Sequence, residues 1–161
     1  MKLGKFKKLT AALAVCAVMA SALPVVPNMV SAASNIISNS TFDSGITGWS
    51  TYKESGGVCS LSTENGCLAL TVSNVGKVNY AVQVFYDIVP LYQNGVYRLK
   101  YDISSSTDRY IEGMIQQNGG TYQAYTWKGL ELTSVPQTVD YEFTMKAETD
   151  IMSRLFCYKT I

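Results

Sequence analysis

The sequence contains no histidine among its 161 residues. Zinc sites built on imidazole, Ser-His-Asp triads and Cys-His dyads are therefore excluded. Only 16% of the residues are charged, and no segment repeats its apolar residues with the period of an amphipathic helix. Low-complexity linkers and internal repeats are also absent from the sequence. These absences argue against a helical protein and against the common histidine-dependent enzymes.

The amino-terminal segment has the features of an export signal. Four lysines precede an almost uncharged run over residues 9–23, and small side chains follow at residues 31–33. Pro24 and Pro27 limit the run to about fifteen residues, fewer than the roughly 20 that span a membrane. We expect a signal peptide over residues 1–32, cleaved after Ala32, and a secreted bacterial domain over residues 33–161 with no membrane attachment. Without the leader's lysines the net charge falls from +1 to −3, which argues against binding nucleic acid.

Alternation with a period of two residues predicts an all-β domain. It is clearest over residues 96–103 and 139–145, where apolar and polar side chains alternate. Turn residues such as Asn65-Gly66 and Asn94-Gly95 separate the runs. The resulting fold class is a two-sheet antiparallel β-sandwich, or jelly roll. The remaining expected strands cover residues 36–38, 49–52, 58–61, 67–73, 79–89, 109–117, 122–127 and 154–158.

Three cysteines follow the leader, at Cys59, Cys67 and Cys157. Cys59 and Cys67 flank a turn signal, so they could form a disulfide across or beside a hairpin in an oxidising compartment. All three could equally be free thiols that pack as small apolar side chains. The sequence leaves both alternatives open.

Four segments in order carry a family resemblance. They are Asn39-Ser40-Thr41-Phe42-Asp43 with Gly48-Trp49, residues 80–99 with Gln83 in mid-strand, residues 109–120, and residues 138–155. In this order they resemble the β-sandwich carbohydrate-binding modules of families 4, 9 and 22, which are often appended to secreted bacterial glycoside hydrolases. The resemblance implies non-catalytic binding of a plant-type polysaccharide, namely xylan, β-glucan or amorphous cellulose, in a concave cleft. The module would target an attached or associated hydrolase.

Family members usually continue into a final strand that pairs with the amino-terminal region and helps to complete a structural calcium site. The sequence departs from this pattern because it stops at Ile161, so we expect a sandwich that lacks the last strand. Asp43 and Glu54 resemble the oxygen-rich amino-terminal positions that assist calcium in these modules. Carboxylates suit calcium, which prefers oxygen ligands.

Strand alternation also predicts where sugar would bind. Ile111 and Ile115 share one face of their strand, which leaves Glu112 and Gln116 on the other. Amides, carboxylates and arginine can meet sugar hydroxyls, and aromatic rings can cover the apolar faces of the sugar. Each polar residue could instead be the solvated side of a half-buried sheet. The predicted carbohydrate-binding residues are Gln83, Arg109, Glu112, Gln116, Gln117, Tyr122 and Trp127, with Tyr125 expected on the Trp127 face and Trp49 expected in the core.

No pair of carboxylates has a spacing that marks a glycosidase, so we expect no catalysis within this segment. One alternative is a secreted cell-surface or adhesion β-sandwich domain that does not bind sugar. Another is a fragment of a glycoside hydrolase whose catalytic domain lies beyond Ile161.

Overall fold

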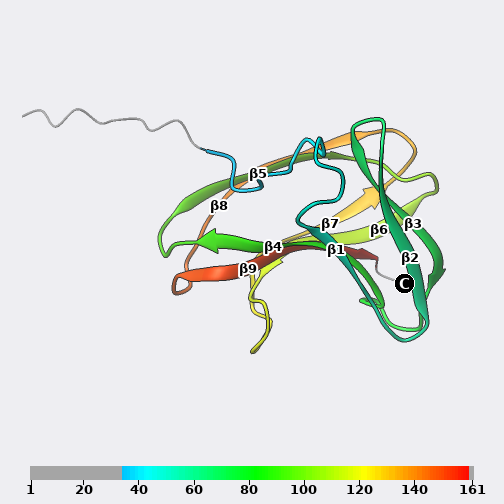
Figure 1. Cartoon of the computed structure of the whole chain (residues 1–161). Helices are drawn as coiled ribbons and strands as arrows, with labels where there is room; N and C mark the ends of the chain where they lie inside the picture. Colours follow the sequence, from blue (N-terminus) through cyan, green and yellow to red (C-terminus); the bar gives the residue numbers. More distant parts are fainter. Residues whose placement is uncertain (1–33, 160–161) are drawn as a thin grey trace, which may run out of the picture. The chain divides into compact units, whose positions relative to one another are not determined.

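The computed structural model describes residues 34–159, and the predicted signal peptide lies outside them. Within this range the chain forms nine strands and no helix, so it contains no helix that could cross a membrane (Figure 1). The strands are β1 (Trp49–Lys53), β2 (Gly57–Glu64), β3 (Cys67–Val75), β4 (Val82–Leu91), β5 (Val96–Ile103), β6 (Arg109–Gln116), β7 (Ala124–Leu132), β8 (Gln137–Thr144) and β9 (Asp150–Lys159).

Five strands form the main sheet, in the order β1-β4-β9-β6-β7, and every neighbouring pair is antiparallel. Strand β9 lies at its centre, so the last strand described is held on both sides by strands from earlier in the chain. Strands β5 and β8 form a separate two-stranded sheet, and β2 and β3 form another. The predicted antiparallel β-sandwich is confirmed.

The hydrophobic core lies between the main sheet and the β5–β8 pair (Figure 1). One cluster contains Tyr86, Ile115 and Leu155 of the main sheet, with Tyr97 and Phe143 of β5 and β8 packed against it. A second cluster continues the layer, where side chains of β6 and β7 meet those of β5 and β8. We call this side of the main sheet its inner face, and the opposite side, which β5 and β8 do not cover, its outer face.

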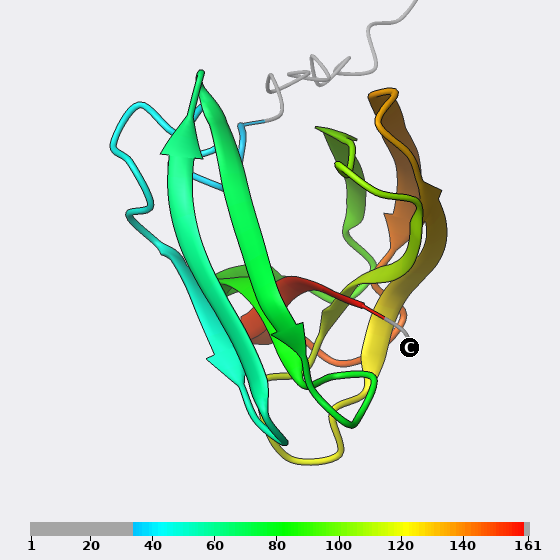
Figure 2. The same ribbon diagram turned by 90° about the vertical axis from the view of Figure 1, so that its right-hand side faces the viewer.

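The β2–β3 hairpin stands apart from the β5–β8 pair, to the left in Figure 2 while β8 (orange) is on the right. It is closed by Asn65 and Gly66, both of which have positive φ angles, as a tight hairpin turn requires. Cys59 pairs with Val72 in this hairpin, whereas Cys67 pairs with Glu64 at its tip. The two cysteines point to opposite faces of the strand pair, so of the two alternatives the structure has the free thiols, for all three described cysteines.

The prediction of a first strand at residues 36–38 is wrong, because this segment consists of bends and turns. The side chain of Asn39 donates hydrogen bonds to the carbonyl oxygens of Gly45 and Thr47, at 2.8 and 2.9 Å. These bonds fold the segment into a compact loop. Trp49 comes after this loop and packs against the core, as predicted. Its ring contacts Tyr86, and its indole N–H donates to the carbonyl oxygen of Asn39.

Candidate functional site

Three of the predicted polar binding residues share the outer face of the main sheet. Gln83 of β4 lies in one row with Tyr158 of β9 and Glu112 of β6, because these residues are direct partners in the strand register. Gln116 lies two rows away and is paired with Arg154. Same-face rows are two residues apart, so each row lies about 7 Å from the next. The outer face therefore carries two polar rows on either side of a central row.

The central row is apolar and buried. It consists of Phe85, Phe156 and Met114, which lie side by side on β4, β9 and β6 and are at most 8% exposed. The guanidinium of Arg154 stacks on the Phe85 ring at 4.0 Å from its centroid, and its Nε donates to an Asp87 carboxylate oxygen at 2.5 Å. This packing holds Arg154 in place while its terminal nitrogens remain able to donate.

Tyr158 and Glu112 form the second polar contact of the outer face. Burial raises the pKa of the Tyr158 phenol far above its usual range, and its hydrogen bond to the Glu112 side chain raises the pKa further. The amide of Gln83 donates to the Tyr80 carbonyl at 3.1 Å, which fixes its orientation and leaves its carbonyl oxygen as an acceptor. Donors and acceptors thus lie close together in this row.

Exposed aromatic side chains stand at both edges of the outer face. Trp127 of edge strand β7 is 53% exposed and is paired with Met114 of the central row. On the opposite edge, Tyr52 of β1 is paired with Gln83. The pKa of Tyr52 is raised by its hydrogen bond to Glu54, by burial and by the charges of Glu54, Tyr122 and Tyr80, so these tyrosines lie near one another.

The β6–β7 connection (yellow in Figure 1) carries Tyr122 and projects from the main sheet on the side away from β5 and β8. Tyr122 is 63% exposed and has a positive φ of 54°, which is uncommon for an aromatic residue. Its ring is therefore presented to solvent beside the outer face. Both aromatic residues that the sequence predicted, Tyr122 and Trp127, are placed where a ligand on this face could reach them.

Tyr110 lies across β7 rather than standing upright from β6. A Cβ atom built on Gly129 would be 2.0 Å from the Tyr110 hydroxyl oxygen and 2.7 Å from its Cζ atom. Gly129 is the register partner of Glu112 on the outer face. The missing side chain at Gly129 thus leaves room for the Tyr110 ring over β7.

Arg109 and Gln117 are not brought to the outer face. Arg109 is paired with Leu132 of the core, and its Nη2 donates to Thr107 at 2.7 Å. Gln117 lies beyond the end of β6 and lines a separate cavity of about 350 Å³ together with Gln123 and Asp150. Gln116 belongs to the outer face whereas Gln117 lines this cavity, so the structure does not bring the two amides to one surface.

The prediction for Tyr125 is wrong. It was expected on the Trp127 face, but it packs against the core and its hydroxyl donates to Asp150 at 2.8 Å. The cause is a β-bulge: Ile115 is paired with Thr126, yet Gln116 is paired with Ala124, so Tyr125 is an extra residue. The hydrogen bond and burial raise the pKa of Tyr125 to about 12, burial contributing most.

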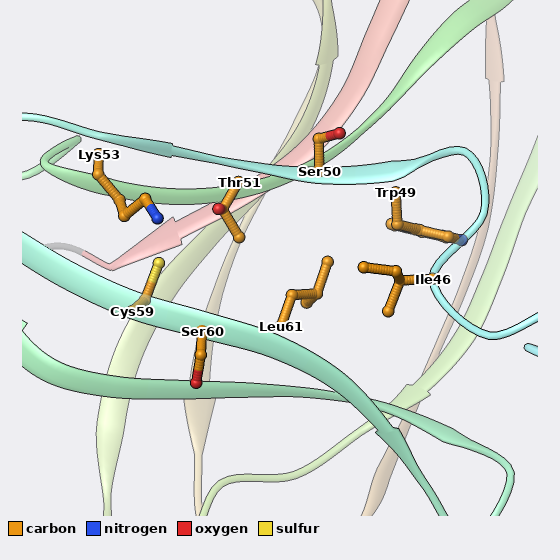
Figure 3. Close-up of a pocket in the computed structure, with 8 residues that line it drawn as sticks. All are labelled: Ile46, Trp49, Ser50, Thr51, Lys53, Cys59, Ser60 and Leu61. Atoms are coloured by element: carbon orange, nitrogen blue, oxygen red, sulfur yellow. The ribbon is translucent and has the colours of Figure 1, made fainter.

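A larger cavity of about 460 Å³ lies between β1 and β2 (Figure 3). The side chains of Ile46, Trp49 and Leu61 point into it, whereas Ser50 points away. Its walls are a mixture of apolar and polar residues, and Trp49, which packs against the core, places the cavity on the inner side of β1. None of the predicted sugar-binding residues lines it.

The predicted calcium ligands each have another partner. A carboxylate oxygen of Asp43 accepts a hydrogen bond from Thr41 at 2.6 Å, and one of Glu54 accepts from Tyr52 at 2.6 Å. Between residues 34 and 159 no group of three or more acidic or cysteine side chains could hold a metal ion. Calcium takes six to eight oxygen ligands, so the site stays a prediction.

Among the residues not predicted to bind are Tyr52, Arg154 and Tyr158 on the outer face. Tyr80, which precedes β4, was not predicted either. The sequence of the last strand contained a weak signal, since Arg154 and Tyr158, which carry polar groups, fall on one side of the alternation, and Leu155 and Cys157 fall on the other. No such signal exists for Tyr52 and Tyr80, because their nearness to Tyr122 depends on the strand order and on the β6–β7 loop.

Comparison with known proteins gives a consistent result. A family described as "Carbohydrate binding domain" matches residues 34–157. Endoglucanase C of Cellulomonas fimi is 33% identical over 135 residues, and a cellulose 1,4-beta-cellobiosidase of Acetivibrio thermocellus is 30% identical over 122. The matches cover 83% and 68% of this chain but only 12% and 14% of the two relatives.

Solved structures show the same fold. One, described as "CBM4 structure and function", superposes with a TM-score of 0.72 at 21% identity and covers 78% of this chain and 89% of that one. The amino-terminal cellulose-binding domain of Cellulomonas fimi beta-1,4-glucanase C has a TM-score of 0.51 at 25% identity, over 74% of this chain and 90% of that domain.

Proposed function

Because the chain belongs to the carbohydrate binding domain family, we propose that the outer face of its main sheet binds a single polysaccharide chain without catalysis. A pyranose ring has apolar faces and carries hydroxyl groups around its rim. Such a ligand needs aromatic surfaces and polar groups that both donate and accept. Family membership does not favour the alternative of a cell-surface or adhesion domain that does not bind sugar.

The observation that carries the proposal is the arrangement of the outer face. On its three middle strands, polar side chains form two rows on either side of the apolar central row. Gln83, Tyr158 and Glu112 make up one row, and Arg154 and Gln116 belong to the other. Exposed aromatic rings stand at both edges, with Trp127 on β7 and Tyr52 on β1. A glycan lying across the strands would have its hydroxyls hydrogen-bonded by the polar rows of the middle strands and its rings stacked on the aromatic side chains at the edges.

The proposed ligand is a β-linked plant polysaccharide, such as xylan, β-glucan or amorphous cellulose. The names of the relatives, which refer to cellulose and β-1,4-glucan, support this choice. Since the chain spans a small share of those relatives, we further propose that the module serves an appended or associated glycoside hydrolase. The predicted signal over residues 1–32 supports export from a bacterial cell. Structural calcium involving Asp43 and Glu54 remains part of the proposal.

Affinity gel electrophoresis tests the proposal. The mature domain should be retarded by at least one of soluble xylan, mixed-linkage β-glucan and hydroxyethyl cellulose. Trp127→Ala should lose most of the retardation, because it removes an exposed stacking surface worth about 1–1.5 kcal/mol, or roughly tenfold in affinity. Gln116→Ala should weaken binding as well.

Val96→Ala is the matched control, because Val96 is 66% exposed but belongs to β5, in the other layer of the sandwich. It should bind as the wild type does. If no glycan retards the wild-type domain, or if Val96→Ala loses binding as Trp127→Ala does, the outer face is not the site.

A further inference from the structure

An exposed apolar surface continues the outer face beyond the Asp87–Arg154 pair. It consists of Ile88 and Pro90 of β4 with Ile151 and Met152 of β9, and we call these four residues the shelf. Ile88, Ile151 and Met152 are each more than half exposed. Exposed aliphatic side chains are common singly, but a contiguous group beside a candidate site calls for an explanation.

Two β-bulges create the shelf. Tyr86 is paired with Leu155 and Val89 with Ser153, so Asp87 and Ile88 together oppose the single residue Arg154. The next irregularity is the reverse: between the pairs Val89–Ser153 and Leu91–Asp150, Ile151 and Met152 together oppose Pro90. The second bulge restores the register that the first one shifts.

The bulges also decide which way these side chains point. Tyr86, Val89 and Leu91 all belong to the same core cluster, and Ser153 is fully buried, with its hydroxyl donating to the Val89 carbonyl. The residues between these anchors therefore face away from the core, on the outer face. In a regular pair, Ile88 would instead have turned inward.

The backbone of Ile88 is strained. Its φ is +62°, and a β-branched residue in this region is a genuine outlier. Strain of this kind persists where the surroundings impose it and is concentrated at functional sites. Here it keeps an isoleucine exposed next to Asp87, whose carboxylate binds Arg154 in the proposed sugar site.

We propose that the shelf contacts apolar substituents on the bound polysaccharide, and specifically O-acyl groups carried on one edge of its main chain. The proposal rests on the proposed function. A glycan that lies across the strands, over the polar rows, would have the shelf along one edge rather than at its end. The shelf side chains are uncharged and offer no hydrogen-bonding groups to hydroxyls, but they suit the methyl group of an ester.

Binding to O-acetylated xylan and glucomannan, each before and after mild alkaline deacetylation, tests this proposal by isothermal titration calorimetry. The wild type should prefer the acetylated form about fourfold, as expected for burying one methyl-sized group. Ile88→Asn should abolish the preference and leave affinity for the deacetylated form unchanged. Asparagine tolerates a positive φ, so this variant should fold at least as stably, and Met152→Gln provides a second test of the same surface.

Val96→Asn is the control, since it makes the same kind of change at an exposed aliphatic residue of the other layer. It should keep the preference. Equal affinity of the wild type for both forms, or a preference that survives in Ile88→Asn and Met152→Gln, overturns the shelf proposal while sugar binding itself stands. A wild-type domain that binds neither form, nor β-glucan, overturns the proposed function and the shelf proposal together.

Discussion

Replacing Gly129 with alanine tests whether the flat Tyr110 ring takes part in binding. The new Cβ atom would stand 2.0 Å from the Tyr110 hydroxyl oxygen and 3.0 Å from its Cε2 atom, so the ring must leave its position over β7. Gly129 does not have a positive φ, and its backbone therefore accepts alanine. Because Tyr110 is only half-buried and can swing outward, we expect a loss of stability near the low end of the roughly 1–3 kcal/mol typical of overpacking.

Gly129→Ala should weaken binding even though the domain stays folded. A sugar ring that covers about 60 Å² of the Tyr110 face contributes about 1.5 kcal/mol, so Gly129→Ala should weaken binding roughly tenfold. Calorimetry with the best-bound oligosaccharide measures this, and thermal melting confirms the fold. In a Tyr110→Ala background, Gly129→Ala should have no further effect on affinity. Unchanged affinity in Gly129→Ala would refute a role for the ring.

Two further predictions concern the cysteines. Burial raises the pKa of the Cys157 thiol from 9.0 to about 12. Because the unfolded chain releases this proton at a lower pH than the folded domain, the contribution to folding stability is fully present below pH 9 and is lost as pH rises toward 12. Urea unfolding between pH 9 and 10 should therefore show stability falling at up to about 1.4 kcal/mol per pH unit, and an equally steep fall in Cys157→Ala would contradict this. Among the three described cysteines, only exposed Cys67 should react quickly with iodoacetamide in the native domain; rapid labelling of Cys59, detected by mass spectrometry, would count against the structure.

The sequence predicted the regular part of the fold because alternation is a local property. Residues 96–103 alternate without interruption, and β5 covers the same residues. Strand β6 likewise has Ile111 and Ile115 on the inner face and Glu112 on the outer one. Strand order is not local, however. No pattern within β1 or β9 indicates that Tyr52 and Tyr158 lie on either side of Gln83.

The errors have physical causes that the alternation rule omits. Residues 36–38 have the composition of a strand, but the side chains of Asn35 and Asn39 bind nearby backbone groups and favour a loop. A bulge in β7 moved Tyr125 from the expected outer face to the core. Gln117 lies beyond the end of β6 and lines a separate cavity, a placement that alternation within the strand does not predict.

The irregular positions of the main sheet all lie at one end of the outer face. The bulges at Asp87–Ile88, at Ile151–Met152 and at Tyr125 surround Arg154 and Gln116, which end the second polar row. At the other end, the row that contains Gln83 and Glu112 is in regular register. A regular sheet would present the same alternation along its whole length. At one end, the bulges replace this alternation with the Asp87–Arg154 ion pair and the apolar shelf. One edge of a bound glycan would therefore lie against polar groups in regular register, and the other edge against the ion pair and the shelf. Binding would then depend on which edge carries a substituent.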